Sequence, residues 1–326
     1  MTEFSEPTTT KELSAGESGL EIPCPLEARP ELFDKPSVFI AGGIGGVGDV
    51  ENWQQRMIHQ MLADTDIIAL NPRRENFPVA DPEALEVQVT WEHNALKIAQ
   101  SISFWLPAAY SCPVTVYELG TWSMRAKPIF VGIDPDYPNR DSLVSQLSVT
   151  RPNLRVHSSL EKLASDVKAW VNRSGRLDLP NPRPSFDPKS VYLSGGINNC
   201  PDWQAEISSS LSRSSIVVVN PRAGSLDAAK ITSAKLRELA AANHRKLLNC
   251  ESFCVWVHEE SSSPASLFEL GAIASMLERP LFVGAHPNYF RAKDVVLQTG
   301  LVRPEVKVVD SLQDLAGQVN EYYSLR

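Results

Sequence analysis

The chain has 326 residues, of which 43% are hydrophobic and 21% charged, and its formal net charge is −8. This length suffices for about two domains that each bury a core, and the composition is that of a globular protein. An acidic chain without a block of Lys or Arg argues against polymeric nucleic acid as a partner. No apolar run approaches the roughly 20 residues that span a bilayer, so a membrane protein is not expected either.

The five cysteines are odd in number and lack a paired Cys-x-x-Cys spacing, and the six histidines are scattered. Neither a disulfide framework nor a metal site is therefore expected. Residues 1–33 are rich in Thr, Ser, Glu and Pro, which is typical of a mobile tail. They hold no basic region followed by an apolar core, so we predict no secretory signal and expect a cytoplasmic protein.

Four near-continuous apolar runs in the first half predict short buried strands. They cover residues 36–41, 66–70, 102–106 and 127–132. Loops with glycine, proline and polar residues, together with amphipathic or apolar-periodic helical segments, separate the runs. Strands of this kind that alternate with helices indicate a parallel sheet covered on both faces.

The second half repeats this order of strands, loops and helices. The equivalent runs cover residues 190–194, 215–219, 253–257 and 279–284. The offset between equivalent positions barely drifts: for the first glycine of the loop it is 195 − 42 = 153, and for the Glu of Glu-Leu-Gly it is 269 − 118 = 151.

We therefore predict an α/β protein made of two doubly wound parallel-sheet domains that arose by internal duplication. The predicted boundaries are 34–171 for the first domain and 189–326 for the second. A Pro-rich linker at 172–188 is predicted to join them.

Each half carries one Glu in the same setting, Glu118 and Glu269, near the start of a helix that follows a buried strand. A carboxylate there faces the crevice at the carboxyl ends of parallel strands, where open α/β sheets bind small ligands. A Glu near a helix N-terminus can also simply complement the helix dipole. Both residues are candidate catalytic groups, with the purely structural role left open.

Several short motifs, in their order and spacing, resemble the nucleoside 2-deoxyribosyltransferase-like superfamily, and most closely its second branch. The motifs are strand-Gly-Gly-Ile, Trp53-Gln54, Asn71-Pro72-Arg73-Arg74, Trp91-Glu92, Phe104-Trp105-Leu106-Pro107, Tyr117-Glu118-Leu119-Gly120 and Gly132-Ile133-Asp134-Pro135-Asp136-Tyr137. The resemblance covers about residues 36–150, and a weaker copy covers about 190–300. It implies a flavodoxin-like (Rossmann-like) fold for each half and an enzyme that needs no cofactor.

In that family the Glu before Leu-Gly attacks the anomeric carbon of a (deoxy)ribonucleoside. This role maps onto Glu118, with Glu269 as its counterpart in the repeat. A carboxylate can trap an oxocarbenium-like sugar as a covalent ester, which is later released to another base or to water. Transfer and hydrolysis therefore both stay open.

The chain departs from the better-known transferases at the group that would protonate the leaving base. Those enzymes carry an Asp six residues before the nucleophile, where this chain has Cys112 and Ser263. Our candidate is instead Glu92, because a carboxyl beside the aromatic surface of Trp91 can have the raised pKa that a general acid needs. An exposed helix residue is the alternative.

The glycine-rich loop after the first strand resembles the phosphate-holding loop of related deoxynucleoside-monophosphate glycosidases. Its candidate ligand-binding residues are Gly42, Gly43, Gly45, Gly46 and Asp49. Glycines let backbone N–H groups approach an anion near a helix start, although a tight strand-to-helix turn would also need them. The loop does not fit Gly-x-Gly-x-x-Gly in the usual register, so a dinucleotide site is disfavoured.

Other polar and aromatic residues of the first half could hold the rest of a nucleotide. Candidates are Asn71, Arg73 and Arg74 for a phosphate or base carbonyl, and Trp91, Trp105 and Tyr137 for stacking on a base. Solvated surface positions for the arginines and core packing for the aromatic rings are the alternatives.

The halves are unequal, because the second has a plain helical segment where the first has Trp91-Glu92, so we expect the first to hold the more complete site. The leading hypothesis is an N-glycosidic-bond enzyme that acts on a small-molecule nucleoside or nucleotide. An NAD-glycohydrolase-type enzyme and a catalytically silent nucleotide-binding or scaffold module are the alternatives. Family members commonly build active sites at subunit contacts, which leaves open a homo-oligomer or a fused pair that imitates a dimer.

Overall fold

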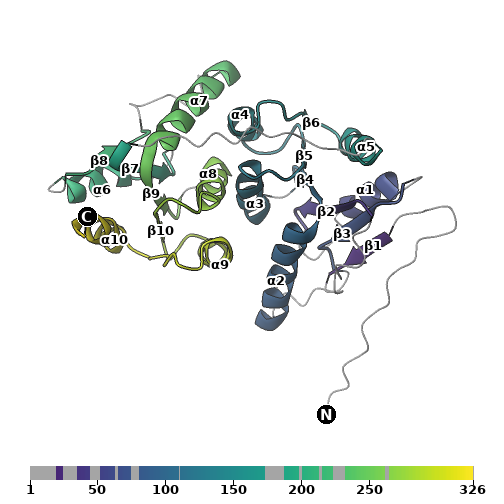
Figure 1. The fold of residues 1–326 in the computed structure, drawn as a ribbon, viewed down its shortest axis with the longest axis horizontal. Helices are drawn as coiled ribbons and strands as arrows, with labels where there is room; N and C mark the ends of the chain where they lie inside the picture. Colours follow the sequence, from purple (N-terminus) through teal and green to yellow (C-terminus); the bar gives the residue numbers. More distant parts are fainter. Residues whose placement is uncertain are drawn as a thin grey trace, which may run out of the picture. The chain divides into compact units, whose positions relative to one another are not determined.

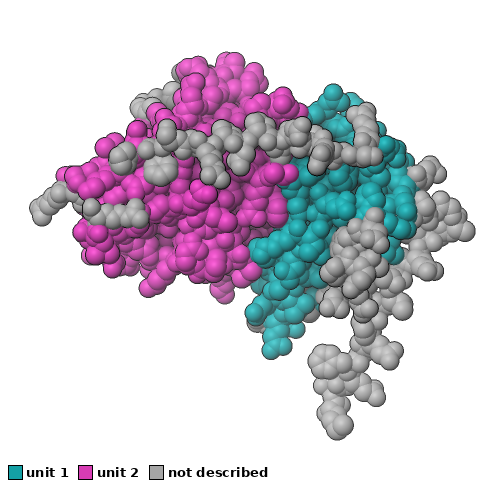
Figure 2. Space-filling model, in the orientation of Figure 1, with its two compact units in different colours: residues 1–111, 127–137, 155–179 teal, residues 112–126, 138–154, 180–326 magenta. Residues whose placement is uncertain are grey.

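The structure is a computed structural model in which strands and helices alternate along the chain (Figure 1). It describes residues 20–24, 35–44, 52–62, 65–74, 81–109, 111–172, 187–197, 200–212, 215–222, 232–260 and 264–325. The chain divides into two compact units, shown in teal and magenta in Figure 2. Unit 1 comprises residues 1–111, 127–137 and 155–179, and unit 2 comprises 112–126, 138–154 and 180–326.

In the described part of the chain, unit 1 contains a parallel sheet with the strand order β1-β3-β2-β4-β5-β6. The strands are β1 (Leu20–Pro23), β2 (Ser37–Gly42), β3 (Ile68–Asn71), β4 (Ser101–Leu106), β5 (Ile129–Ile133) and β6 (Val156–His157). Apart from β1, this is the 2-1-3-4-5 order of flavodoxin. The inner strand β4 is buried along its whole length, as its continuous apolar sequence predicts.

Helices cover both faces of the sheet in unit 1. They are α1 (Trp53–Leu62), α2 (Pro82–Ile98) and α5 (Leu160–Val171). Because side chains alternate along a strand, Val38 and Ile40 of β2 join the core cluster with α1 and α5. Phe39 points to the other face, where its ring centroid lies 6.2 Å from that of Trp91 on α2. Unit 1 is therefore doubly wound.

Unit 2 has the same strand order as unit 1 in its own parallel sheet, β10-β9-β7-β8. The strands are β7 (Asp187–Gly195), β8 (Val217–Val219), β9 (Cys250–Val257) and β10 (Leu281–Ala285). A parallel bridge between Gly284 and Val309 supplies the fifth position of the flavodoxin order. One face packs on α6 (Trp203–Leu211) and α10 (Leu312–Ser324), through a core that includes Trp203 and Trp256.

The remaining helices of unit 2 come from both repeats. They are α3 (Pro113–Ser123) and α4 (Arg140–Thr150) from the first repeat, and α7 (Ser233–Asn249), α8 (Pro264–Ala274) and α9 (Ala292–Val302) from the second. Helices α3 and α8 approach very closely: a Cβ added at Gly120 would lie 2.0 Å from the carbonyl oxygen of Phe268, and one at Gly271 would lie 1.9 Å from that of Tyr117. The contact is reciprocal, since equivalent residues meet.

The predicted α/β architecture with two parallel sheets is confirmed, and two details differ from the sequence-based expectation. Residues 20–24 lie in the segment predicted to be a tail, but Leu20–Pro23 forms β1, with Ile22 buried and Glu21 accepting a 2.7 Å hydrogen bond from Asn71. Pairing with β3 outweighs the polar composition around this short apolar stretch. The compact units also do not follow the repeat boundaries, because α3 and α4 belong to unit 2.

The predicted linker at 172–188 falls mostly outside the described residues, so the domain boundaries stay a prediction. Among the described helices, none is long and apolar enough to cross a bilayer.

Candidate functional site

The loop that follows β2 in unit 1 is held by side chains from two sequence motifs. Trp53 Nε1 and Gln54 Nε2 donate hydrogen bonds to the carbonyl oxygen of Gly43, at 2.9 and 3.2 Å. Arg73 Nη1 donates to the carbonyl oxygen of Ile44 at 3.2 Å and to Gln54 Oε1 at 3.3 Å. The Trp-Gln and Asn-Pro-Arg motifs therefore fix the start of the glycine loop at the carboxyl end of β2.

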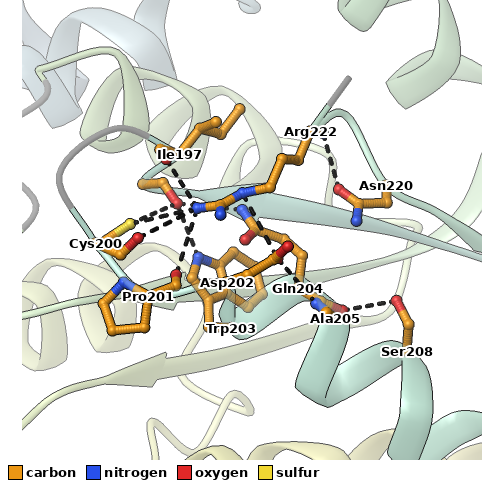
Figure 3. A network of polar contacts seen from close by, with 11 residues as sticks. Ile197, Cys200, Pro201, Asp202, Trp203, Gln204, Ala205, Ser208, Asn220 and Arg222 are labelled. Carbon is orange, nitrogen blue, oxygen red and sulfur yellow. Dashed lines mark hydrogen bonds and ion pairs between the residues drawn. The ribbon is translucent and has the colours of Figure 1, made fainter. Parts of the chain in front are cut away.

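Unit 2 repeats this arrangement almost contact for contact (Figure 3). Trp203 Nε1 and Gln204 Nε2 donate to the carbonyl oxygen of Gly196, at 2.9 and 3.1 Å. Arg222 Nη2 donates to the carbonyl oxygen of Ile197 at 2.8 Å and lies close to the carbonyl groups of residues 200 and 201. Because the same network occurs in both units, we infer that the Trp-Gln and Asn-Pro-Arg motifs have a structural role, which is to fix the loop after the first strand of each repeat.

These contacts bear on the residues predicted to bind a phosphate. Asn71 accepts a hydrogen bond from the backbone N–H of Arg73 at 3.0 Å and donates to Glu21, so its amide serves the fold. Arg73 engages the loop itself, and Arg74 is partly buried. Gly42 and Gly43 lie at the carboxyl end of β2 as expected. The other predicted loop residues, Gly45, Gly46 and Asp49, lie outside the described residues.

The three aromatic residues predicted to stack on a base differ in their exposure. Trp105 is 6% exposed and belongs to the core of unit 1. Tyr137 is 4% exposed, and its hydroxyl donates to the carbonyl oxygen of Ser111 at 2.5 Å. Both rings pack in the interior, which is the alternative that the sequence left open. Trp91 is only partly buried, and its ring centroid lies 6.2 Å from that of Phe39.

Glu92, the candidate general acid, is tied to its surroundings by Gln88. Gln88 Nε2 donates to Glu92 Oε1 at 2.7 Å and to the carbonyl oxygen of Pro72 at 2.6 Å, while the Cys24 thiol donates to Gln88 Oε1 at 3.0 Å. Burial raises the pKa of Glu92 to about 7, although the hydrogen bond from Gln88 acts in the opposite direction. A carboxyl with this pKa can hold or release a proton near neutral pH. The cause of the raised pKa is the removal of the carboxyl group from water.

Glu118 lies in the second turn of α3, a helix whose residues from 115 to 123 are all buried, and it is itself 8% exposed. Tyr117, directly before it, donates from its hydroxyl to the carbonyl oxygen of Gln298 at 3.3 Å. Cys112, at the position where related transferases carry Asp, is buried and begins the helix in a left-handed conformation with φ 45°. Its counterpart Ser263 lies outside the described residues.

Glu269 on α8 accepts hydrogen bonds from side chains of two other elements of unit 2. Ser194, at the end of β7, donates from Oγ to Glu269 Oε2 at 2.8 Å. Gln146, on α4, donates from Nε2 to Glu269 Oε1 at 3.0 Å. Burial raises the pKa of Glu269, and these two hydrogen bonds lower it in part. The carboxyl group is therefore held in one orientation by a donor on each oxygen.

Tyr192 adds a third polar group on the same face of β7, two residues before Ser194. It is fully buried, and its hydroxyl has no hydrogen-bond partner among the described residues. Burial first, and then the charge of Glu269, raise the pKa of Tyr192 well above its ordinary value. Sequence reasoning missed Tyr192, Ser194 and Gln146 as site residues. The available signal was a pair of polar side chains at alternate positions of an otherwise apolar strand.

A narrow crevice of about 10 Å³ lies beside Glu269, which is room for a single water molecule. It is lined by Gln146, Thr150, His244, Leu247, Phe268, Glu269, Ala272 and Met276. In the part of the chain that the structure describes, no three His, Cys, Asp or Glu side chains gather to hold a metal ion.

A larger cavity of about 360 Å³ lies at the opposite, amino end of β9 and β10. Its arginines serve the fold: Arg279 donates to the carbonyl oxygens of Leu247 and Cys250, and Arg303 donates to those of Met276 and Arg279. Cations at the ends of helices are stabilising there. The cavity is therefore separate from the carboxyl ends of the strands, where this fold binds ligands.

The chain matches the model of one protein family, described as "nucleoside 2-deoxyribosyltransferase like", twice. The matches cover residues 35–137 and 188–289. A search of curated proteins gave no match. The two matched ranges cover more than half of the 326 residues and coincide with the predicted duplication. The chain therefore belongs to the nucleoside 2-deoxyribosyltransferase-like family, with the family's unit present twice in tandem.

Proposed function

We propose that the protein makes or breaks the N-glycosidic bond of a nucleoside or nucleotide, with the carboxylate of a Glu-Leu-Gly motif, Glu118 or Glu269, as nucleophile. The observation that carries the proposal is the setting of Glu269, whose two oxygens accept hydrogen bonds from Ser194 and Gln146 beside the carboxyl end of β7. Membership of the family supports a nucleoside-type substrate.

The chemistry is a double displacement. A carboxylate oxygen forms a bond to the anomeric carbon while the bond from that carbon to the base nitrogen breaks, and the electron pair leaves with the base. A general acid donates a proton to the departing base. A second base or a water molecule then attacks the same carbon and releases the carboxylate, which gives transfer or hydrolysis.

The test is turnover by the whole chain of a panel of nucleosides, nucleoside 5′-monophosphates and NAD, with and without a free acceptor base. Products separated by chromatography distinguish transfer from hydrolysis and reveal cleavage of NAD. We expect turnover, and we expect it to fall by at least about 10³-fold in a Glu118→Gln, Glu269→Gln double variant, because removal of a nucleophile leaves only binding and electrostatic effects.

Glu206→Gln, an exposed carboxylate on α6, is the matched control and should keep the activity of the wild type. Undiminished turnover by the double variant would rule out the carboxylate mechanism. A wild-type chain that binds members of the panel but converts none of them would identify a silent nucleotide-binding module instead.

A further inference from the structure

The two repeats differ at two strand positions that precede their glycine loops. Tyr192 and Ser194 on β7 correspond to Phe39 and Ala41 on β2, with 192 − 39 = 153 and 194 − 41 = 153, the same offset as for the loop glycines. In unit 1 the Phe39 ring meets Trp91, and Ala41 is buried without a polar group. The second repeat therefore carries two buried hydroxyl groups where the first is apolar.

Buried hydroxyl groups are unfavourable unless they form hydrogen bonds, so their presence in a strand interior needs a reason. Ser194 has one, since it donates to Glu269 at 2.8 Å. Tyr192 has none among the described residues, although it is 0% exposed; burial raises its pKa, and the charge of Glu269 raises it further. An unsatisfied hydroxyl on the strand face that also carries Ser194, the donor to Glu269, is suited to a hydrogen bond that forms only when a substrate or a transition state is present.

Gln146 completes the set from a different part of the chain. It lies on α4 of the first repeat, yet it donates to Glu269 of the second at 3.0 Å. Ser194 and Gln146 each engage one carboxylate oxygen, which fixes the plane of the group and leaves further lone pairs on both oxygens. A fixed carboxylate with a free lone pair is what nucleophilic attack on carbon requires.

We infer that the second repeat carries the working nucleophile, Glu269, and that Ser194 and Gln146 are its positioning residues. This inference rests on the proposed function and names the site at which the N-glycosidic bond is attacked. It also reverses the expectation from sequence that the first repeat holds the more complete site.

The closing experiment compares Glu269→Gln with Glu118→Gln, each as a single substitution in the full chain. We expect the first to lower kcat by at least about 10³-fold and the second to change it by less than about 10-fold. The reverse result, or equal losses, overturns the inference while the proposed function stands. Failure of the wild-type chain to convert any member of the panel overturns the proposed function, and this inference with it.

A trapping experiment locates the ester directly. A 2′-deoxy-2′-fluoroarabinosyl nucleoside slows release of a glycosyl ester, because fluorine disfavours the positively charged sugar in the transition state. Intact mass followed by peptide mapping should place the adduct on the peptide that contains Glu269. An adduct on the peptide that contains Glu118 contradicts the inference.

The positioning role of Ser194 has its own readout in the pH profile of kcat/KM. Ser194→Ala removes a donor that favours the charged carboxylate, so the pKa of Glu269 rises and the acidic limb of the profile moves to higher pH. Ser194→Thr, which keeps a hydroxyl group, should restore the profile. The matched control is Ser252→Ala, a buried serine on β9 that bonds to Tyr323 instead, and an identical shift there would mean a merely structural effect.

Discussion

At the scale of single residues, Glu92 shows how burial of a carboxyl group links stability to pH. Its pKa rises from 4.5 to about 7 on folding, so the folded state favours the protonated form. The stabilisation that this proton supplies is fully present below about pH 4.5 and is lost as the pH rises to about 7. The total loss is up to about 3 kcal/mol.

We therefore predict that Glu92→Gln gains stability relative to the wild type as the pH rises from about 4.5 to about 7, because an amide has no proton to lose. Urea unfolding at several pH values measures the difference. The control is Glu86→Gln, an exposed carboxylate on the same helix. If the free energies of unfolding of Glu92→Gln and the wild type differ by the same amount at every pH, the raised pKa of Glu92 is contradicted.

Arg222 is the second residue whose role can be tested alone. Its guanidinium reaches the carbonyl of Ile197 at 2.8 Å and those of the following loop from one rigid fork, which an ammonium group cannot reproduce (Figure 3). Arg222→Lys should lower the free energy of unfolding by about 1–3 kcal/mol. Chemical denaturation measures it, with the exposed Arg245→Lys on α7 as control. An unchanged free energy of unfolding would mean that the hydrogen bonds from Arg222 to the loop do not stabilise the protein.

At the scale of elements, the contact between α3 and α8 depends on two glycines. A side chain at Gly271 would meet the carbonyl oxygen of Tyr117 at 1.9 Å, and one at Gly120 would meet that of Phe268 at 2.0 Å. Backbone atoms on both sides leave no flexible group to give way. Thr121 reinforces the pair by donating from its hydroxyl to the carbonyl oxygen of Gly271 at 3.1 Å.

We predict that Gly120→Ala and Gly271→Ala each destabilise the protein by about 1–3 kcal/mol or more, because the helices must separate. Gly300→Ala in α9 and Gly317→Ala in α10 are matched controls, since these helical glycines have nothing within 4 Å of an added Cβ. They should be stabilising by about 0.4–1 kcal/mol. Thermal unfolding of the four variants gives the comparison. Destabilisation of all four alike would contradict the close contact as the cause, because the two controls have open space around the added Cβ.

The sequence predicts these elements well and their partners poorly. Strands β2 and β4 are recognisable because a continuous apolar run suits an inner strand of a parallel sheet. Strand β1 is short and flanked by polar residues, so local pattern does not reveal its pairing with β3. The duplication predicts that α3 and α8 are equivalent, but only their packing shows that the glycine of Glu-Leu-Gly serves helix contact.

The candidate site likewise contains residues that the sequence predicts and residues that only the tertiary structure reveals. Glu269 is predictable because its motif recurs at a fixed offset from Glu118. Its hydrogen-bond partners Ser194 and Gln146 are not, because they lie 75 and 123 residues away along the chain and meet it only through tertiary packing. Trp105 lies in the core cluster, and sequence could not decide this, since an aromatic residue at a strand end looks the same in sequence whether it faces a ligand or the core.

At the scale of the whole molecule, the compact units cut across the duplication, because α3 and α4 belong to the first repeat in sequence but to unit 2 in space. Helix α8 is buried on nearly every side, with Leu267, Phe268 and Ile273 among its buried residues. Part of that burial comes from α3, and Gln146 of α4 satisfies the carboxyl group of Glu269. The second repeat is therefore incomplete without two helices that precede it in the chain.

We predict that a fragment of residues 187–326 fails to fold cooperatively, since removal of α3 and α4 exposes the apolar face of α8 and leaves a buried carboxyl group without one of its donors. Urea unfolding should show a broad transition with a low m-value, and the fragment should bind a hydrophobic dye. A fragment of residues 1–172, which carries α3 and α4, should restore a cooperative transition when the two are mixed. If 187–326 alone unfolds as sharply as the full chain, the second repeat is self-sufficient and the helices of the first contribute little to its stability.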